Sequence, residues 1–424
     1  MKTTREITRD LALLFLTVFA VASARGHNLP DAFNAILNGG VESLAVQADG
    51  KILLGGFFTV VGGQPRTNMA RLNPDGTLDT NFVPRLPMYG RRVVALPSGK
   101  VVVGGIYNPL GQSALARALV RFETNGSVDT SFDTPLFRDM PFAVAVQADG
   151  KVVAGFQTSP CIARFNTDGS LDTNFLARAD VAVYDLVIQP DGKILAAGYF
   201  NTMNNQPHRL LARLNADGSV DSSFNTQIGR QGEGGAVRRV AVQADGKIVF
   251  GGGFFAVNGV PRQNLARVNA DGTLDVQFNA GANGEVHGVL AQPNGRIVIV
   301  GDFTMLNGQP RVRVGRVNWD GSLDPTLTVG ADGFVRAAAL QSDGKILVGG
   351  QFTTLGGATR LYAGRINADA NPSPIFIDAH SVRRLNDGAF QFSFLNGNAA
   401  SLSVLASDEV TAPLATWANL GVER

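Results

Sequence analysis

Seven copies of one unit run through most of this chain. Each copy carries a turn signal, Asp-Gly-Lys or a close variant, and an arginine followed by an apolar residue recurs in step with it. The period is mostly 49 residues and ranges from 42 to 54. The turn signals begin at Asp49, Ser98, Asp149, Asp191, Asp245, Asn294 and Asp343. A fixed period of this length indicates an array of small structural units that pack on one another.

Each unit contains four short runs of strand-forming residues. In the first copy, 41–47 and 51–59 flank the first Asp-Gly turn, and 68–73 and 78–82 flank a second one. The second run does not alternate apolar with polar residues, so both of its faces are expected to be buried. The 50 glycines among 424 residues and the low charged fraction of 17% also suit a turn-rich protein. We therefore predict an all-β fold, a seven-bladed β-propeller of four-stranded antiparallel blades.

The two ends of the chain differ from the repeats. Residues 1–24 combine a basic start, an apolar stretch and a small-residue cleavage site, which is typical of a signal peptide. The propeller is expected over 25–370. Residues 371–424 are expected to form a linker and a short C-terminal β segment, a sandwich-like module shorter than such modules usually are.

The seventh unit lacks a recognisable fourth strand, because prolines occupy its place. Phe33 precedes the turn residue Lys51 by 18 residues, the same spacing by which Phe278 precedes Arg296. We therefore expect residues 31–35 to supply the outer strand of blade seven and to close the ring.

The repeated motifs also resemble a known family. The pattern Asp-Gly-Lys-Ile, Gly-Gly-x-Phe, Asn-Gly-x-Pro-Arg, Leu-Ala-Arg-Leu-Asn-Ala-Asp-Gly-Ser and Asp-x-x-Phe-Asn is similar to the delta-60 repeat of bacterial secreted β-propellers, over residues 31 to about 370. The resemblance implies a propeller fold and an extracellular location, but no reaction and no catalytic residues. The apolar runs that end in Gly-Gly also look like kelch blades, a likeness that is analogy only.

Charge and hydropathy restrict the partners. The net charge of +2 gives no general attraction to nucleic acid or to a membrane surface. Beyond residue 24, no apolar run approaches the ~20 residues of a membrane-spanning helix. The single Cys161 excludes a disulfide within the chain. We expect a secreted or cell-surface protein, not inserted in a membrane after signal removal, whose partner is a glycan, a small anionic ligand or an extracellular protein.

The repeated arginine is followed eight residues later by an aspartate. The spacing is reminiscent of calcium-binding loops, but an arginine stands at the first ligand position and cannot coordinate a cation. We expect no metal and no cofactor, and we interpret the residues as structural ion pairs between the third and fourth strands. The predicted pairs are Arg71 with Asp79, Arg121 with Asp129, Arg164 with Asp172, Arg213 with Asp221, Arg267 with Asp275 and Arg316 with Asp324.

The start of the first strand in each unit is the candidate ligand site. These positions lie nine residues before the turn lysine or arginine, where the strand is expected to enter the central channel. They are Glu42, Arg91, Phe142, Tyr184, Arg238, His287 and Arg336. Three arginines against one glutamate favour an anionic ligand such as an acidic sugar. The alternative is that strand starts are merely solvated and free to vary.

Loop lengths indicate which face binds. The distance between the repeated Arg and Phe is constant, whereas the loops that emerge on the opposite face vary in length, as binding loops do. No HExxH, GxSxG or P-loop pattern is present. We expect a non-catalytic scaffold that binds through its variable-loop face. Two alternatives stay open: a hydrolase or lyase in which His287, Tyr184 and Glu42 converge at the channel mouth, and a structural or adhesive cell-surface protein.

Overall fold

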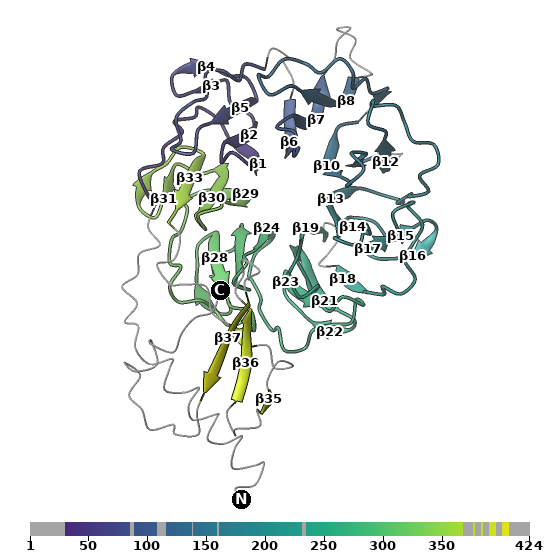
Figure 1. The fold of residues 1–424 in the computed structure, drawn as a ribbon, viewed down its shortest axis with the longest axis vertical. Helices are drawn as coiled ribbons and strands as arrows, with labels where there is room; N and C mark the ends of the chain where they lie inside the picture. Colours follow the sequence, from purple (N-terminus) through teal and green to yellow (C-terminus); the bar gives the residue numbers. More distant parts are fainter. Residues whose placement is uncertain are drawn as a thin grey trace, which may run out of the picture.

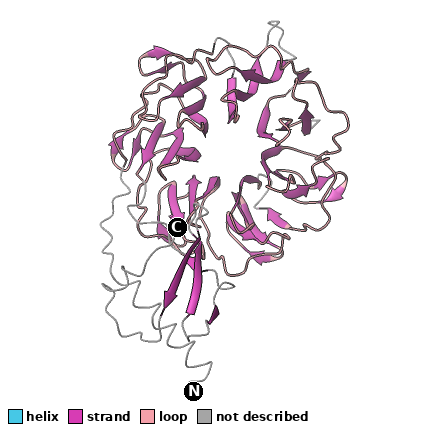
Figure 2. Ribbon diagram, in the orientation of Figure 1, coloured by secondary structure: helices cyan, strands magenta, loops and turns pink. Residues whose placement is uncertain are grey.

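Seven small antiparallel sheets stand around a central axis in the computed structural model of the chain (Figure 1). The structure describes residues 30–367 except 85–88, 108–115, 138, 159–160 and 231–234, and beyond them four strands between 376 and 406. The described part of the chain consists of strands, turns and loops without a helix (Figure 2). The predicted all-β, seven-bladed propeller is confirmed.

Each blade is built on three strands in the order inner, middle, outer. The inner strands line the axis and are β1 (Val41–Val46), β6 (Tyr89–Ala95), β10 (Pro141–Val146), β13 (Val183–Ile188), β19 (Val237–Val242), β24 (Val286–Ala291) and β29 (Phe334–Leu340). The middle strands are β2 (Ile52–Gly56), β7 (Val101–Tyr107), β11 (Val152–Phe156), β14 (Ile194–Gly198), β20 (Ile248–Gly252), β25 (Ile297–Gly301) and β30 (Ile346–Gln351). The outer strands are β5 (Met69–Leu72), β8 (Ala116–Phe122), β12 (Ile162–Phe165), β17 (Leu211–Leu214), β23 (Leu265–Val268), β28 (Val314–Val317) and β33 (Ala363–Ile366).

The predicted fourth strand is reduced to a single bridge in most blades. In blade one, Leu78 pairs with Leu72, and the Asp79 side chain then accepts a hydrogen bond from the backbone N–H of Asn81 at 3.0 Å. This local turn ends the pairing, because a capping side chain takes the place of a ladder hydrogen bond. The chain then crosses to the next blade, where the Val83 N–H donates to the Asn125 carbonyl. Only blade two gains a short fourth strand, β9 (Leu136–Phe137), within the described residues.

Short hairpins between the middle and outer strands receive the crossing segments. They are β3 (Val60–Val61) with β4 (Gln64–Pro65), β15 (Thr202–Met203) with β16 (Gln206–Pro207), β21 (Phe254–Val257) with β22 (Val260–Pro261), β26 (Met305–Leu306) with β27 (Gln309–Pro310), and β31 (Thr354–Leu355) with β32 (Ala358–Thr359). The segment from the preceding repeat pairs with such a hairpin, as Ala179 does with Met203, and β18 (Ile228–Arg230) pairs with β21. Successive blades are therefore joined by backbone hydrogen bonds as well as by packing.

The N-terminal segment closes the ring. Pro30 pairs with Ile366 of blade seven, and the Asp31 N–H donates to the Arg365 carbonyl at 3.2 Å. Leu37 then pairs with Val61 of blade one. The N-terminal segment therefore closes the ring as predicted, but through one bridge at Pro30 and not through a strand over 31–35. Its crossing segment pairs with the hairpin of blade one as the crossing segments do at blades four to seven.

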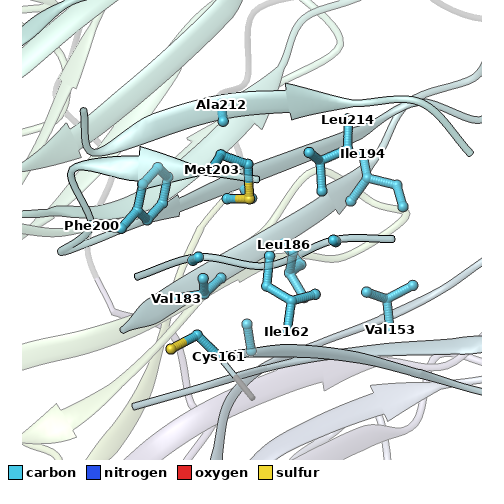
Figure 3. Close-up of a cluster of buried hydrophobic side chains, with 14 of the residues drawn as sticks. Val153, Cys161, Ile162, Val183, Leu186, Ile194, Phe200, Met203, Ala212 and Leu214 are labelled. Atoms are coloured by element: carbon cyan, nitrogen blue, oxygen red, sulfur yellow. The ribbon is translucent and has the colours of Figure 1, made fainter. Parts of the chain in front are cut away.

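Hydrophobic clusters fill the space between neighbouring blades. Figure 3 shows one of them, in which Cys161 and Ile162 of blade three face Val183 and Met203 of blade four. The middle strands are buried on both faces, as their unbroken apolar runs predicted. Cys161 is a buried free thiol in this core.

Beyond the propeller, four strands form one antiparallel sheet. They are β34 (Phe376–Ile377), β35 (Arg383–Arg384), β36 (Phe390–Leu395) and β37 (Ser401–Ala406). The predicted signal peptide, 1–24, lies outside the described residues. Within the described part, no helix is long and apolar enough to cross a membrane.

Candidate functional site at the channel mouth

A β-bulge positions the candidate residue in every inner strand. In blade one, Val41 pairs with Gly56 and Ser43 with Gly55, so Glu42 is the extra residue between them. An extra residue leaves the ladder and turns its side chain away from the sheet. The same register shift occurs at all seven positions, and we call this set the bulge ring: Glu42, Arg91, Phe142, Tyr184, Arg238, His287 and Arg336.

The Gly-Gly ends of the middle strands make room for these bulges. A Cβ placed on Gly252 would collide with the carbonyl oxygen of Ala236, and a Cβ on Gly56 would collide with that of Gly40. The backbone that enters each inner strand therefore lies directly against the middle strand. Glycine is needed because the close approach leaves no space for a side chain.

All seven members of the bulge ring line one cavity of about 170 Å³. Arg92, Arg239 and Glu285 complete its lining. The volume lies below the ~300–1,000 Å³ of pockets for drug-sized ligands, so the cavity suits one small chemical group. Five arginines against two glutamates give the lining an excess of positive charge.

Blades two to five form an aromatic and cationic half of the cavity. The Arg91 guanidinium carbon lies 3.7 Å from the centre of the Phe142 ring, and that of Arg238 lies 4.6 Å from the centre of the Tyr184 ring. The two rings are 5.3 Å apart. Stacking of this kind holds long side chains in place and adds a cation–π attraction. This half of the cavity is therefore a preformed aromatic platform, formed by Phe142 and Tyr184, with a guanidinium group at each end.

Two further arginines fix the backbone below this platform. Arg92 donates to the carbonyl oxygens of Phe142 at 2.6 Å and Tyr184 at 3.3 Å, and Arg239 also donates to the Tyr184 carbonyl at 3.3 Å. The Oδ1 atom of Asp185 lies 3.9 Å from Nη2 of Arg92 and 3.8 Å from Nη1 of Arg239. Burial raises the pKa of Asp185 to about 6, against the lowering effect of Arg92. The three side chains tie blades two, three, four and five together beside the channel.

Blades six and seven form an acid–base half. The Arg238 Nε donates to Glu285 Oε1 at 2.8 Å, and His287 Nε2 lies 3.1 Å from Asp302 Oδ2. The same His287 nitrogen is 2.9 Å from Nη1 of Arg336. Burial, assisted by the charge of Arg336, lowers the pKa of His287 below its usual 6.5. The imidazole is therefore neutral at neutral pH.

Glu285, His287 and Asp302 also have the chemistry of metal ligands, with one ligand atom from each lying within 4.8 Å of the others. Arg238 and Arg336 already place their guanidinium groups against two of these three side chains. The positive charge that a metal ion would supply is thus provided by the protein, and the arrangement disfavours a second cation.

The repeated arginines lie on the outer strands, far from the axis, and each aspartate follows beyond the next turn. Each predicted pair is in contact, with Nε–Oδ2 distances from 2.6 to 2.9 Å at Arg71–Asp79, Arg121–Asp129, Arg164–Asp172, Arg213–Asp221, Arg267–Asp275 and Arg316–Asp324. The lysine of the Asp-Gly-Lys turn contacts the same aspartate oxygen, as Lys51 Nζ does with Asp79 Oδ2 at 2.9 Å. Burial opposes ionisation of Asp79, but hydrogen bonds from Lys51 and Arg71 outweigh it and lower its pKa. A seventh pair, Arg365 with Asp31 at 2.8 Å, was not predicted.

Sequence reasoning missed four residues around the cavity, namely Arg92, Arg239, Glu285 and Asp302. The doubled arginines at 91–92 and 238–239 were a visible signal for the first two, because both doublets stand at strand starts that become bulges. Asp302 had no such signal, since it follows the middle strand β25 and reaches His287 only through tertiary packing. Parts of the variable loops, 108–115 and 231–234, lie outside the described residues.

The fold and the lining of its axis define a seven-bladed β-propeller with a polar site at the channel mouth. A family model described as "Domain of unknown function (DUF5122) beta-propeller" matches residues 47–82, 96–132, 147–175, 189–224, 243–278, 292–327 and 341–371. The chain belongs to this family of β-propeller repeats. No curated protein matches the chain.

Solved structures share the fold at low sequence identity. Virginiamycin B lyase from Staphylococcus aureus is 11% identical with a TM-score of 0.53, covering 79% of this chain and 97% of that chain. Its catalytically inactive variant with quinupristin is 12% identical with a TM-score of 0.52, covering 79% and 98%. The WD40 β-propeller domain of Doa1 is 16% identical with a TM-score of 0.51, covering 81% and 97%. Such identities support the propeller fold alone.

Proposed function

We propose that this protein is a secreted propeller that binds a small anionic ligand, an acidic sugar unit, at the channel mouth. The observation that carries the proposal is the convergence of the seven bulge-ring residues on one cavity whose lining has five arginines and two glutamates. A carboxylate matches the planar, two-pronged donor geometry of a guanidinium group. The proposed location outside the cytoplasm rests on the basic and apolar start of the chain.

The aromatic platform favours a sugar over an inorganic anion. Phe142 and Tyr184 present two rings between Arg91 and Arg238. The guanidinium groups cover one face of each ring, and both rings still line the cavity. The apolar C–H face of a pyranose would pack on the ring surface that faces the cavity, while its carboxylate reaches a guanidinium group beside it. The small volume of about 170 Å³ restricts the bound part to about one sugar unit.

Calorimetric titration with oligogalacturonate, and with its carboxyl-reduced neutral counterpart, tests the proposal. We expect the acidic sugar to bind, more weakly as salt is raised, and the neutral one not to bind. Replacing Arg91, Arg238 and Arg336 by alanine should weaken binding at least about tenfold, because charge-assisted hydrogen bonds are lost.

The matched control removes three arginines away from the cavity, Arg66, Arg178 and Arg209, and should bind like the wild type. Equal binding by both triple variants, or no preference for the acidic sugar, would reject the channel mouth as the site. A protein partner or a structural role would then be the better account.

A further inference from the structure

His287 is the one imidazole among the described residues that line the cavity. Its Nε2 atom has two competing neighbours. Asp302 Oδ2 lies at 3.1 Å and Arg336 Nη1 at 2.9 Å. A ring nitrogen either donates a proton or accepts one, so it serves only one of these neighbours at a time. The other ring nitrogen, Nδ1, lies 3.9 Å from Glu285 Oε2. The choice at Nε2 therefore decides whether Nδ1 carries a proton or a lone pair.

An anionic ligand would settle this choice. While Arg336 donates to Nε2, the neutral imidazole holds its proton on Nδ1. A ligand carboxylate that takes the Arg336 N–H groups leaves Nε2 to carry the proton and donate it to Asp302. Nδ1 then carries the lone pair of a base, and Glu285 stands beside it to stabilise the imidazolium that forms. Binding of such a ligand would thus convert His287 into a general base.

We propose that the channel mouth catalyses β-elimination on an acidic saccharide, with His287 as the base and Tyr184 as the acid. This inference rests on the proposed function and adds a reaction to it, in place of the non-catalytic role expected from the sequence. The C–H bond next to the sugar carboxylate breaks and its proton passes to His287. A C=C bond forms to the neighbouring carbon, and the C–O bond on that carbon breaks.

The balance of the step needs no further reactant. The leaving oxygen takes a proton from the Tyr184 hydroxyl, and the imidazolium of His287 returns its proton through water to the resulting phenolate. Arg336 on the carboxylate stabilises the negative charge that develops after proton removal. Among the described residues of the cavity lining, Tyr184 alone carries a hydroxyl group.

The charges in the cavity favour elimination over hydrolysis. Glycoside hydrolysis ordinarily uses two carboxyl groups, one of which must be protonated to act as the acid. Of the two glutamates in the lining, Glu285 is already engaged, because its Oε1 atom accepts a hydrogen bond from Arg238 Nε at 2.8 Å. Elimination needs one base and a cation on the substrate carboxylate, and the cavity supplies both. The groups that face His287 are Glu285, Asp302 and Arg336.

Incubation of the purified protein with polygalacturonate and with alginate tests the inference, with ultraviolet absorbance of the conjugated product as the readout. We expect product with at least one of the two polymers. The rate should rise with pH through a midpoint below 6.5, because burial and Arg336 lower the pKa of His287. His287→Gln should lower the rate about 10²-fold or more, as loss of a general base does.

His208 offers a matched control, because it is also a buried histidine whose pKa burial lowers, but it lies outside the cavity lining. His208→Gln should keep the wild-type rate. Asp302 is a positioning residue, and its charge raises the pKa of His287. Asp302→Asn should therefore lower the rate and also move the pH midpoint to lower pH, a shift that a merely structural residue would not cause.

The outcomes separate the two proposals. Binding of the acidic sugar with no unsaturated product from either polymer would overturn the elimination and leave the proposed function standing. Product formation that His287→Gln does not slow would also overturn the role of His287. Absence of binding to the acidic sugar, together with absence of product from both polymers, would reject the proposed function and the elimination with it.

Discussion

Arg267 illustrates what the repeated arginine does at the scale of one residue. Its side chain is almost fully buried, donates to Asp275 and to Gln243 Oε1, and stacks on Phe278 at 4.5 Å. It also donates to the carbonyl oxygen of Trp319 in the next blade, at 2.5 Å. One guanidinium group therefore fixes a hairpin, covers an aromatic ring and links two blades. These contacts use the several donors and the flat face of arginine.

Arg267→Lys keeps the charge but removes the planar donors and the stacking. We expect the free energy of unfolding to fall by about 3 kcal/mol, since a buried ion pair loses its geometry. Urea unfolding monitored by fluorescence measures the change. The exposed Arg178 provides the control, and Arg178→Lys should change stability by less than about 0.5 kcal/mol. Equal effects of the two substitutions would show that Arg267 contributes only its charge.

At the scale of one element, the bulge of each inner strand depends on the glycines that end the neighbouring middle strand. Gly251 faces Val286 of the next blade, and Gly252 lies against the Ala236 carbonyl. The bulge then directs Arg238 into the cavity. Glycines that look like packing residues in the sequence are thus what allows the site residues to converge.

Gly252→Ala tests this coupling within blade five. The added methyl group would collide with the Ala236 carbonyl oxygen, so we expect the free energy of unfolding to fall by about 2 kcal/mol. Gly253→Ala is the matched control, because its methyl group would meet only the Glu285 side chain at ordinary contact distance. Thermal or urea unfolding of both variants measures the two changes in the free energy of unfolding. A similar loss of stability in both variants would contradict the steric explanation.

At the scale of the whole molecule, stability depends on joining the two ends of the propeller. Asp31 accepts a hydrogen bond from Arg365 Nε at 2.8 Å, and Arg360 of blade seven donates to the Asp31 carbonyl. Phe33 takes the place of the repeated phenylalanine, 5.0 Å from the guanidinium carbon of Arg365. The N-terminal segment thus reproduces, in a different order of sequence, the contacts found inside the other blades.

Asp31→Asn should weaken this closure, because Arg365 loses its charged partner in a largely buried position. We expect a loss of about 3 kcal/mol in the free energy of unfolding and faster proteolysis near the N-terminal segment. Limited proteolysis with mass spectrometry and urea unfolding provide the measurements. Asp149→Asn, at an exposed turn, should behave as the wild type. If Asp31→Asn were equally stable and resistant, closure would not depend on this ion pair.

Much of the architecture was predictable because it is local. The period, the Asp-Gly turns and the apolar runs set the strands, and the eight-residue spacing set the six arginine–aspartate pairs. The positions of the bulge ring also came from the repeat, since equivalent residues occupy equivalent places. The prediction of a full fourth strand was wrong. The Asp79 side chain caps a turn there, and this turn prevails over strand propensity because the chain can then pair with the next blade.

Only the tertiary structure decided which distant side chains meet. Asp302 reaches His287 and Arg92 reaches Asp185, although no motif in the sequence connects either pair. Their contacts depend on the curvature of the ring and on the bulges, which arise from packing between blades. By itself the sequence determined the repeating unit, the number of blades and the chemistry at each strand start. The shape, burial and charge balance of the cavity come from closing the ring, which brings residues from all seven blades to one axis.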